Sequence, residues 1–550
     1  MNRLNFLYNM GPSPIKIGVA TLQGSLFARC CALLPEVVPF HIACPKVSRS
    51  IIAILYLFTG LLLSAQDYRD IVINSDIADV QPMTGIVFWD GQNTNTDAIS
   101  LEFSYMLYDD VVDLEGNFVW DEVEDKLNDI AGRNHQAILR FRYTYVGRQT
   151  AVPQYIKNLP DYEEILGQSE GEATWFPNWS HPELQAFNTR FYQAFAERYD
   201  DDPRLAFLQT GFGLWAEYHI YDGPFELGVT FPDMDYQSRF FYHLDTVFQH
   251  TPWSISIDAA DDTYAPFHDS PELLQIRFGN FDDSFMAEEH PYVNALNWQF
   301  FEGNDRYRFS PAGGEFSYYT DWDQAHVLDL PDGAHGISFE ESARNFNITY
   351  MIGNDQPDYQ TMERIKEASL AAGYKFQIKR FQTAAGASVV EVENVGIAPI
   401  YYPAFVAVNG TRSDVSLQGL LPGEVIQCPV AAGNAPDAGD PVLTIECDHL
   451  LSGQKIDYYG TTYVATHEPQ QRELFAKIYP TILSQERLLN IEVEDAILTQ
   501  MTVYNSIGQP VFRAVIHGKK DSIVLPDLLS GIYFVRLQVA DKMTVVRILI

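Results

Sequence analysis

Two glutamates lie in segments whose residue types suit catalysis. Glu217 belongs to Leu205-Ala-Phe-Leu-Gln-Thr-Gly-Phe-Gly-Leu-Trp-Ala-Glu-Tyr-His219, and Glu315 belongs to Pro311-Ala-Gly-Gly-Glu-Phe-Ser-Tyr-Tyr319. Two carboxyls in one cleft can cleave a glycosidic bond when one is protonated to release the leaving oxygen and the other is ionised to face the oxocarbenium-like carbon. When the two carboxyls are about 5–5.5 Å apart, the anomeric configuration of the sugar is retained. A separation of about 6.5–9.5 Å leaves room for a water molecule, and the configuration is inverted.

Each glutamate also has a simpler interpretation. A glutamate at a strand end caps a helix or pairs with an arginine in many proteins, and one that follows two glycines suits a solvated turn. If the extended conformation continues past the apolar residues 205–209, Trp215, Glu217 and His219 project to one side. His219 would then orient Glu217 or bind a sugar hydroxyl, although a lone histidine often satisfies a backbone group instead.

Further polar and aromatic residues are expected near these carboxyls. The residues predicted to bind substrate are Trp89, Trp215, His219, Asp258 and Trp298. Supporting candidates are Glu102, Arg140, Arg142, Asp282 and Asp283. For the two arginines a salt-bridge layer inside the fold is the favoured alternative. Trp89 and Trp215 suit stacking platforms at the floor of a cleft, or core packing, and the aromatic residues of the long loops, such as Trp298, suit the walls of that cleft or a cover for the top of the barrel.

Alternating strands, polar loops and helices between residues 66 and 373 predict the element that positions these residues. The candidate strands are Gly85–Trp89, Ala98–Leu107, Ala137–Tyr143, Leu205–Gly211, Trp253–Asp258, Leu274–Phe278, Gly313–Tyr319 and Asn347–Ile352. Helices are predicted from a capping box at Ser180-His-Pro-Glu183, from about Asp233 to Gln249, and over Thr361–Ala372. The pattern favours an α/β fold, a (β/α)8 TIM-type barrel, whose active sites form at the carboxyl ends of the strands.

Two antiparallel β-sandwich domains are predicted after the barrel, at residues 374–465 and 477–550, joined by a polar linker at 466–476. Residues 1–65 are expected to be a presequence whose apolar h-region, 51–63, predicts a signal peptide, with a single-span anchor as the alternative. The mature chain is then expected to have no transmembrane span. Beyond the presequence only Cys428 and Cys447 remain, and sequence leaves open whether they form a disulfide.

The charge balance excludes two classes of partner. The chain holds 36 Lys and Arg against 73 Asp and Glu, a formal net charge of −37. Nucleic acid and anionic membrane surfaces require basic patches, so neither is an expected partner. No CxxC pair or His/Cys ligand spacing is present, so the sequence predicts neither a metal nor a cofactor.

A set of ordered motifs near the end of the chain carries a family resemblance. The motifs are Tyr479-Pro480, Val503-Tyr-Asn-Ser-Ile-Gly-Gln509, Leu525-Pro526, Leu529-Ser-Gly-Ile-Tyr-Phe-Val-Arg536 and Val545-Val-Arg-Ile-Leu-Ile550. In order and spacing, this module resembles the type A C-terminal sorting domain of the type IX secretion system of Bacteroidota. The resemblance implies export by that machinery, followed by release or attachment at the cell surface.

A second resemblance covers most of the remaining chain. Its motifs are Asp113-Leu-Glu-Gly-Asn-Phe-Val-Trp120, Arg198-Tyr-Asp200, Gly213-Leu-Trp-Ala-Glu-Tyr-His219, Gly313-Gly-Glu315 and Gly373-Tyr374. They look like an uncharacterised secreted family in which a glycosidase-like barrel precedes a β-sandwich. Placing Glu217 after the fourth strand and Glu315 on the seventh is similar to clan A glycoside hydrolases, which implies acid/base and nucleophile roles. Those enzymes usually have Asn before the acid/base, where this chain has Ala216.

Together these observations predict a secreted, carbohydrate-binding protein, and two functions fit it. The first is a glycoside hydrolase that acts on a poly- or oligosaccharide through Glu217 and Glu315. The alternative is a non-catalytic glycan-binding or structural cell-surface protein built on the same barrel, which the residue Ala216 would suit.

Overall fold

The computed structural model describes residues 68–290, 293–302, 306–462 and, with short gaps, 472–549. The predicted signal peptide lies outside these residues. Among the described residues, no helix is both long enough and apolar enough to span a bilayer.

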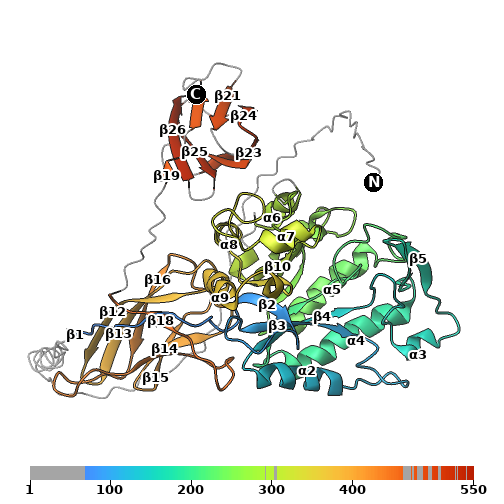
Figure 1. Ribbon diagram of the computed structural model, residues 1–550, viewed down its shortest axis with the longest axis horizontal. Helices are drawn as coiled ribbons and strands as arrows, with labels where there is room; N and C mark the ends of the chain where they lie inside the picture. Colours follow the sequence, from blue (N-terminus) through green and yellow to red (C-terminus); the bar gives the residue numbers. More distant parts are fainter. Residues whose placement is uncertain are drawn as a thin grey trace, which may run out of the picture. The chain divides into compact units, whose positions relative to one another are not determined.

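Eight parallel strands close into a barrel, which confirms the predicted fold class (Figure 1). In chain order they are β2 (Gly85–Trp89), β3 (Leu101–Leu107), β4 (Gln136–Arg142), β7 (Leu205–Gln209), β8 (Trp253–Ser256), β9 (Gly279–Phe285), β10 (Ala312–Phe316) and β11 (Tyr350–Ile352). Each strand pairs with its neighbours in chain order, and β11 pairs with β2 to complete the ring. β7 is therefore the fourth strand and β10 the seventh, as the sequence predicts.

One predicted strand is wrong. Leu274–Phe278 is not a strand: its first residues end the 3-10 helix η2 (Pro271–Gln275), and the sixth barrel strand is the following segment, β9. The apolar side chains of this segment enter the core outside the barrel, where Phe278 packs against Trp253 with ring centroids 5.6 Å apart. The strand itself has the sequence GNFDDSF, and its acidic residues hide the apolar signal of a buried strand.

Helices surround the barrel strands on the outside. They are α2 (Asp121–Gly132), α3 (Gln154–Lys157), α4 (Pro182–Tyr199), α5 (Met234–Val247), α6 (Asn294–Glu302), α7 (Asp321–His326), α8 (Phe339–Asn345) and α9 (Met362–Ala371). The other short helices are η1 (Ile257–Ala260), η3 (Arg306–Arg308) and η4 (Gln356–Asp358). The predicted capping box does not form at α4, because His181 and not Ser180 accepts the Glu183 N–H.

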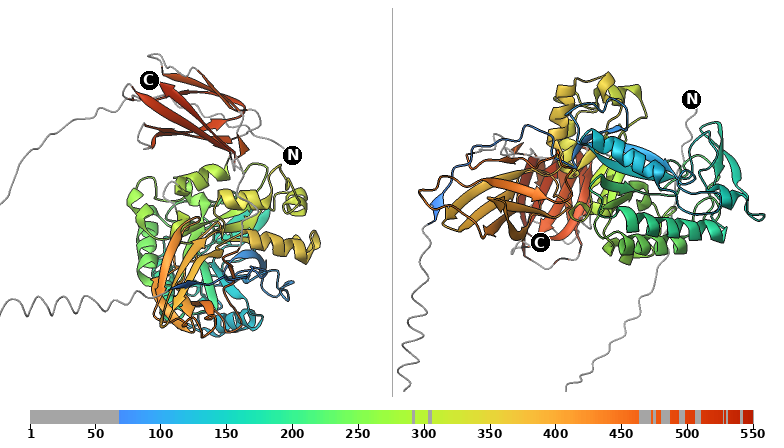
Figure 2. Two further views of the ribbon diagram at one scale, coloured as in Figure 1. Left: turned by 90° about the vertical axis from the view of Figure 1, so that its left-hand side faces the viewer. Right: turned by 90° about the horizontal axis from the view of Figure 1, so that it is seen from below.

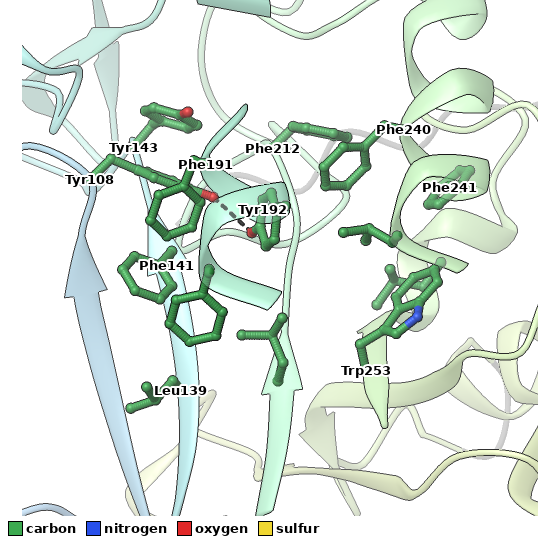
Figure 3. Packing of buried hydrophobic residues seen from close by; sticks show 14 of the residues in the cluster. Tyr108, Leu139, Phe141, Tyr143, Phe191, Tyr192, Phe212, Phe240, Phe241 and Trp253 are labelled. Carbon is green, nitrogen blue, oxygen red and sulfur yellow. Dashed lines mark hydrogen bonds between the residues drawn. The ribbon is translucent and has the colours of Figure 1, made fainter. Parts of the chain in front are cut away.

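An aromatic core joins β4, β7 and β8 to the helices α4 and α5 (Figure 3). Phe191 of α4 lies edge-on to Phe141 of β4, with ring centroids 4.7 Å apart. The Tyr192 hydroxyl, on the same helix, bonds the Tyr108 hydroxyl at 2.8 Å. Much of the high aromatic content is therefore packing that fixes the helices to the barrel wall.

The long loop after β4 carries a hairpin of its own, formed by β5 (Ile165–Ser169) and β6 (Glu172–Phe176). The hairpin is pinned to the loop after β7, because the Glu170 N–H donates to Asp222 at 2.6 Å. Two barrel loops at the carboxyl face are thus held together.

A β-sandwich follows, with its strands after the barrel in yellow and orange in Figure 2 and its first strand, β1, in blue. One sheet has the order β1-β12-β13-β16 with β18 on β12, and the other has the order β15-β14-β17. Their bounds are β1 (Arg69–Asp70), β12 (Phe376–Ala384), β13 (Ala387–Asn394), β14 (Ala404–Val408), β15 (Thr411–Ser416), β16 (Val425–Val430), β17 (Leu443–Cys447) and β18 (Tyr458–Tyr459). Cys428 and Cys447 are buried and not bonded to each other.

In the described part of the C-terminal module, strands β20 to β26 pair antiparallel, as predicted, and only the short β19 that precedes them pairs in parallel. One sheet holds β20 (Ala476–Tyr479), β21 (Leu488–Val493) and β24 (Lys520–Val524). The other holds β19 (Arg472–Glu473), β22 (Leu498–Tyr504), β23 (Pro510–His517), β25 (Ile532–Val539) and β26 (Lys542–Leu549). Strand β19 falls in the predicted linker and pairs with β26. The domain boundaries themselves stay predictions.

The sandwich packs on the amino end of β7 through Tyr402 and His449. Their rings are stacked with centroids 3.6 Å apart. The Tyr402 hydroxyl donates to the Ala206 carbonyl at 2.6 Å, and His449 Nε2 bonds the Leu205 carbonyl at 2.9 Å. Burial lowers the pKa of His449 to about 4, and its Nδ1 has no hydrogen-bond partner, so the folded protein holds this imidazole neutral.

This burial predicts a specific acid sensitivity. Between the ordinary pKa of 6.5 and about 4, an unfolded chain protonates His449 and the folded chain does not. Stability therefore falls as the pH falls, by about 3 kcal/mol over the full interval. His449→Gln keeps a donor for Leu205 but does not titrate, so urea unfolding of this variant at pH 7 and pH 4.5 should show a smaller loss than the parent. Equal losses in parent and variant would contradict this assignment.

Candidate active site at the carboxyl face of the barrel

Glu217 is carried by a tight turn and not by an extended strand. Strand β7 ends at Gln209, so the expectation that the strand continues past residue 209 is wrong. Trp215 and Ala216 have the left-handed φ angles of 53° and 60°, and the Gly213 N–H donates to the Glu217 carbonyl at 2.7 Å. Positive φ at both central residues, with the Glu217 N–H donating to the Leu214 carbonyl at 3.0 Å, is typical of a type I′ turn, which reverses the chain. The turn therefore folds the Glu217 carboxyl back over the barrel mouth.

Two glycines make this turn possible. A Cβ atom on Gly211 would lie 2.2 Å from the Ala216 carbonyl oxygen, and one on Gly213 would lie 1.9 Å from the His219 carbonyl oxygen. Any larger residue would push the turn apart. The spacing of these glycines in the sequence is thus explained by backbone packing.

Glu315 lies inside the barrel on β10. The preceding Gly313 leaves room for the Tyr350 ring, which would be 2.4 Å from an added Cβ. The pairing of β10 with β9 shifts register at this point: Gly314 pairs with Asp282 and Phe316 with Phe285, so two residues of β9 face Glu315 alone. Bulges of this kind re-aim side chains, and this one places Asp283 beside Glu315.

Arg140 of β4 joins the two glutamates. Its guanidinium is completely buried, with one terminal nitrogen 2.8 Å from Glu217 Oε1 and the other 3.1 Å from Glu315 Oε1. Gln209 accepts the Arg140 Nε–H at 2.7 Å and fixes the plane of the group. The ring of Phe281 lies 4.2 Å from the guanidinium carbon. The two predicted catalytic residues are therefore neighbours at one cation.

His219 and Asp258 form a second charged pair in contact with Glu217. His219 Nδ1 lies 2.9 Å from Asp258 Oδ2, and the Ser256 hydroxyl donates to the same oxygen at 2.7 Å. His219 Nε2 faces Glu217 Oε2 at 3.7 Å. Glu217 thus turns one oxygen to Arg140 and the other to His219.

Asp283 completes the cluster. One ligand-type atom from each of Glu217, His219, Asp258 and Asp283 lies within 4.8 Å of the others. Glu217 is 3% exposed and Glu315 is 7% exposed, whereas Asp258 and Asp283 are partly exposed. The site therefore opens to solvent on the side of the two aspartates.

Burial raises the pKa of several of these carboxyls. It raises the pKa of Glu217 well above the usual range, Asp283 adds to the effect, and Arg140 and His219 oppose it. Burial also raises the pKa of Glu315, against the charge of Arg140. The pKa of Asp283 rises to about 7 through burial and the charge of Asp258.

The histidine and its aspartate behave differently. Burial acts to lower the pKa of His219, but the charge and hydrogen bond of Asp258 outweigh it and raise the pKa to about 10. For Asp258, burial acts to raise the pKa, but His219 prevails and lowers it. The pair is therefore ionised at neutral pH, and Asp258 accepts the His219 Nδ1–H.

The predicted aromatic residues lie in different places. Trp215 is half-buried and stacks on Tyr221, which is 55% exposed, with ring centroids 6.0 Å apart. Trp89 is half-buried and edge-on to Tyr105, whose hydroxyl contacts Arg140. Trp298 is 2% exposed and donates to Asp282 at 2.7 Å, so it lies in the packing behind β9.

The supporting candidates also separate. Arg140 and Asp283 join the glutamates, and Arg142 lies over the Tyr145 ring at 4.5 Å. Asp282 points to the helix side of β9, where His290 and Asn294 bond its carboxylate. Glu102 lies apart from the site and pairs with Arg133 and His135.

The sequence predicts Asp283 as a supporting candidate but assigns it no role, because the side of β9 on which it lies depends on the correct bounds of that strand. Tyr319, which is 63% exposed, was not singled out. The charge of Asp283 is one reason that the Tyr319 pKa rises to about 12, after burial, so this hydroxyl belongs to the rim of the site. The doublet Asp282-Asp283 within a strand was the available signal.

Comparison with known proteins identifies the C-terminal module. Residues 477–550 match the secretion system C-terminal sorting domain, which confirms the predicted sorting module. The protein is therefore a secreted one, with the sorting signal that leads to cell-surface attachment. No match is found among the curated proteins.

The solved structures found by shape comparison include several glycosidases. The catalytic domain of a β-amylase from Paenibacillus polymyxa shares 10% identity, with 53% of this chain and 98% of that chain covered and a TM-score of 0.34. A β-L-arabinopyranosidase from Geobacillus stearothermophilus shares 10% identity, with 67% and 96% covered and a TM-score of 0.30. An endoglucanase from an uncultured bacterium shares 9% identity, with 57% and 99% covered and a TM-score of 0.31. Because these TM-scores are low, the fold is assigned from the closed barrel itself.

The shared guanidinium predicts a large, coupled effect on stability. Arg140→Met leaves two buried carboxyls without their counter-charge, which should cost about 3–5 kcal/mol of unfolding free energy. The same change made in a Glu217→Gln, Glu315→Gln background should cost clearly less, because the buried charges are then absent. Urea unfolding of the four proteins measures this coupling. Arg142→Met, in the same strand, is the matched control, and an equal cost of Arg140→Met in both backgrounds would contradict the coupling.

Proposed function

We propose that this protein is a secreted glycoside hydrolase that cleaves a poly- or oligosaccharide, with Glu217 as general acid/base and Glu315 as nucleophile. The observation that carries the proposal is the contact of both carboxyls with adjacent nitrogens of one buried guanidinium, at the carboxyl face of a closed barrel. Active sites of this fold are built at that face.

The single charge of Arg140 supports a division of labour between the two glutamates. One guanidinium balances one carboxylate, so the second carboxyl in the same buried space is favoured in its protonated form. Glu217 suits the protonated role, since it also faces the acidic Asp283. Glu315 suits the ionised role, because fewer acidic groups around it oppose its ionisation and Arg140 is its principal partner. A protonated and an ionised carboxyl are what glycosidic cleavage requires.

The substrate class follows from the surroundings of the carboxyls. Asp258 and Asp283 offer hydrogen-bond acceptors for sugar hydroxyls, and the exposed rings of Tyr221 and Tyr319 offer flat faces for sugar rings. The sorting domain adds that the protein works outside the cell, where extended glycans are available.

A second candidate function is glycan binding without turnover. The low exposure of both glutamates favours it, because Arg140 already holds one oxygen of each. Ala216, at the position where clan A enzymes usually have Asn, points the same way.

The two functions separate in one experiment. The full-length protein is tested on a glycan panel for both binding and released sugar, beside Glu217→Gln and Glu315→Gln. As a hydrolase it should release sugar, and each variant should lose at least about a hundredfold in rate while still binding, because acid/base catalysis alone contributes about 10²–10⁴-fold. Glu122→Gln, on the exposed start of α2, is the matched control and should keep the parental rate. Binding without release in the parent would favour the second function.

The same geometry predicts the stereochemistry of the product. Carboxyl oxygens that contact adjacent nitrogens of one guanidinium favour the shorter gap of about 5–5.5 Å, which is typical of retaining enzymes. Proton NMR of the first sugar released should therefore show the anomer of the substrate. Initial release of the opposite anomer would show that a water molecule, and not Glu315, attacks the sugar.

A further inference from the structure

We propose that Glu217, His219 and Asp283 bind a divalent transition-metal cation such as Zn²⁺, with Asp258 orienting His219. No sequence spacing indicates this site, because these four residues come from three separate places: the turn after β7, the helix η1 after β8 and the interior of β9. Their ligand-type atoms lie within 4.8 Å of one another, and no other group of this kind occurs within the described part of the chain.

The orientation of His219 is the independent observation. The residue is 7% exposed, and its Nε2 is buried without a hydrogen-bond partner. Nδ1 is engaged by Asp258 at 2.9 Å, and Nε2 is directed towards Glu217 Oε2 at 3.7 Å. A histidine that uses one ring nitrogen on a carboxylate and offers the other to an interior space has the arrangement of a metal ligand with its orienting carboxylate.

The charges of the cluster favour a cation. Three carboxyls and one imidazole converge on this space, and Arg140 contacts only the far oxygen of Glu217. Glu217 Oε2 therefore stays available on the side of His219. Carboxylates gathered in a partly closed space repel one another, and a dication between them would offset that repulsion at several oxygens together.

The ligand set limits the class of ion. Zinc binds imidazole nitrogen and carboxylate oxygen at about 2.0–2.2 Å, usually with three protein ligands and one open position when the site is catalytic. Calcium and magnesium prefer oxygen ligands alone, so the imidazole disfavours them. Atoms up to 4.8 Å apart would have to draw closer by small side-chain rotations, and the partial exposure of both aspartates leaves room for this.

This inference goes beyond the proposed function and has a consequence for it. Metal ligands are deprotonated, so a bound cation would displace the Nε2 proton of His219 and also the proton that Glu217 needs as a general acid. Hydrolysis by the glutamate pair and occupation of this site would therefore exclude each other. A bound ion also leaves open positions that sugar hydroxyls can take, which suits the glycan-binding function.

The test is calorimetric titration of the full-length, chelator-treated protein with Zn²⁺ alone and with Ca²⁺ alone. One Zn²⁺ per chain should bind, and Zn²⁺ should raise the thermal midpoint of unfolding. His219→Gln and Asp283→Asn should each weaken Zn²⁺ at least tenfold, in line with the roughly 10–100-fold cost of losing even an orienting group. Calcium should bind more weakly than zinc.

The matched control is His326→Gln, because His326 also pairs with an aspartate, Asp329, at 2.7 Å but belongs to no such cluster within the described residues. This variant should bind zinc like the parent. If His219→Gln and Asp283→Asn unfold at the parental midpoint without metal and still bind Zn²⁺ at parental affinity, the site is wrong. It is also wrong if Ca²⁺ binds more tightly and is unaffected by His219→Gln.

Failure of this inference is distinguishable from failure of the proposed function. Sugar release by a protein that binds no zinc would remove the metal site and leave the hydrolase. Zinc binding by a protein that releases no sugar would remove the hydrolase and leave the metal site.

Discussion

The guanidinium of Arg140 is the interaction on which the rest of the site depends. Without it, the buried Glu315 carboxyl would lose its principal counter-charge and Glu217 would keep only His219, and burying a carboxylate without a partner is strongly destabilising. The ring of Phe281 packs on the guanidinium of Arg140, and Gln209 accepts the Nε–H of the same group. The guanidinium of Arg140 is therefore the common partner of both glutamates, and its position in the barrel interior fixes where their carboxyls lie.

The strands that position the site can be predicted from apolar runs in the sequence. The positions of the side chains that complete the site cannot be predicted in this way. Strand β2 is predicted to the residue and β7 nearly so, since their interiors are apolar. Strand β9 is missed because its acidic residues, including Asp283, interrupt the apolar pattern. The turn that carries Glu217 is missed for another reason: the left-handed angles of Trp215 and Ala216 are imposed by tertiary packing and have no propensity signal.

The two resemblances differ in how far they reach. The sorting domain is identified from ordered motifs, and comparison confirms it. For the barrel, the likeness to clan A enzymes predicts which strands carry the glutamates, and the strand order agrees. It gives no indication of Arg140 as a shared partner, or of His219 and Asp258 as a charged pair, because these contacts join residues from different strands. Trp298 is expected to bind sugar because of its residue type. In the structure its indole instead donates a hydrogen bond to Asp282 within the packing behind β9.

The short strand β1 precedes the barrel in the sequence, yet it pairs with β12, which follows the barrel. Two neighbouring strands of one sandwich sheet are therefore separated in the chain by the whole barrel. Asp70 in β1 lies beside Gln382 in β12, and it also pairs with Arg380, 310 positions further along the chain. In chain order the barrel is thus an insertion into the sandwich. The sheet that contains β1 is completed only after the barrel has been synthesised. Strand β1 can therefore pair with β12 only after the whole barrel between them has been made.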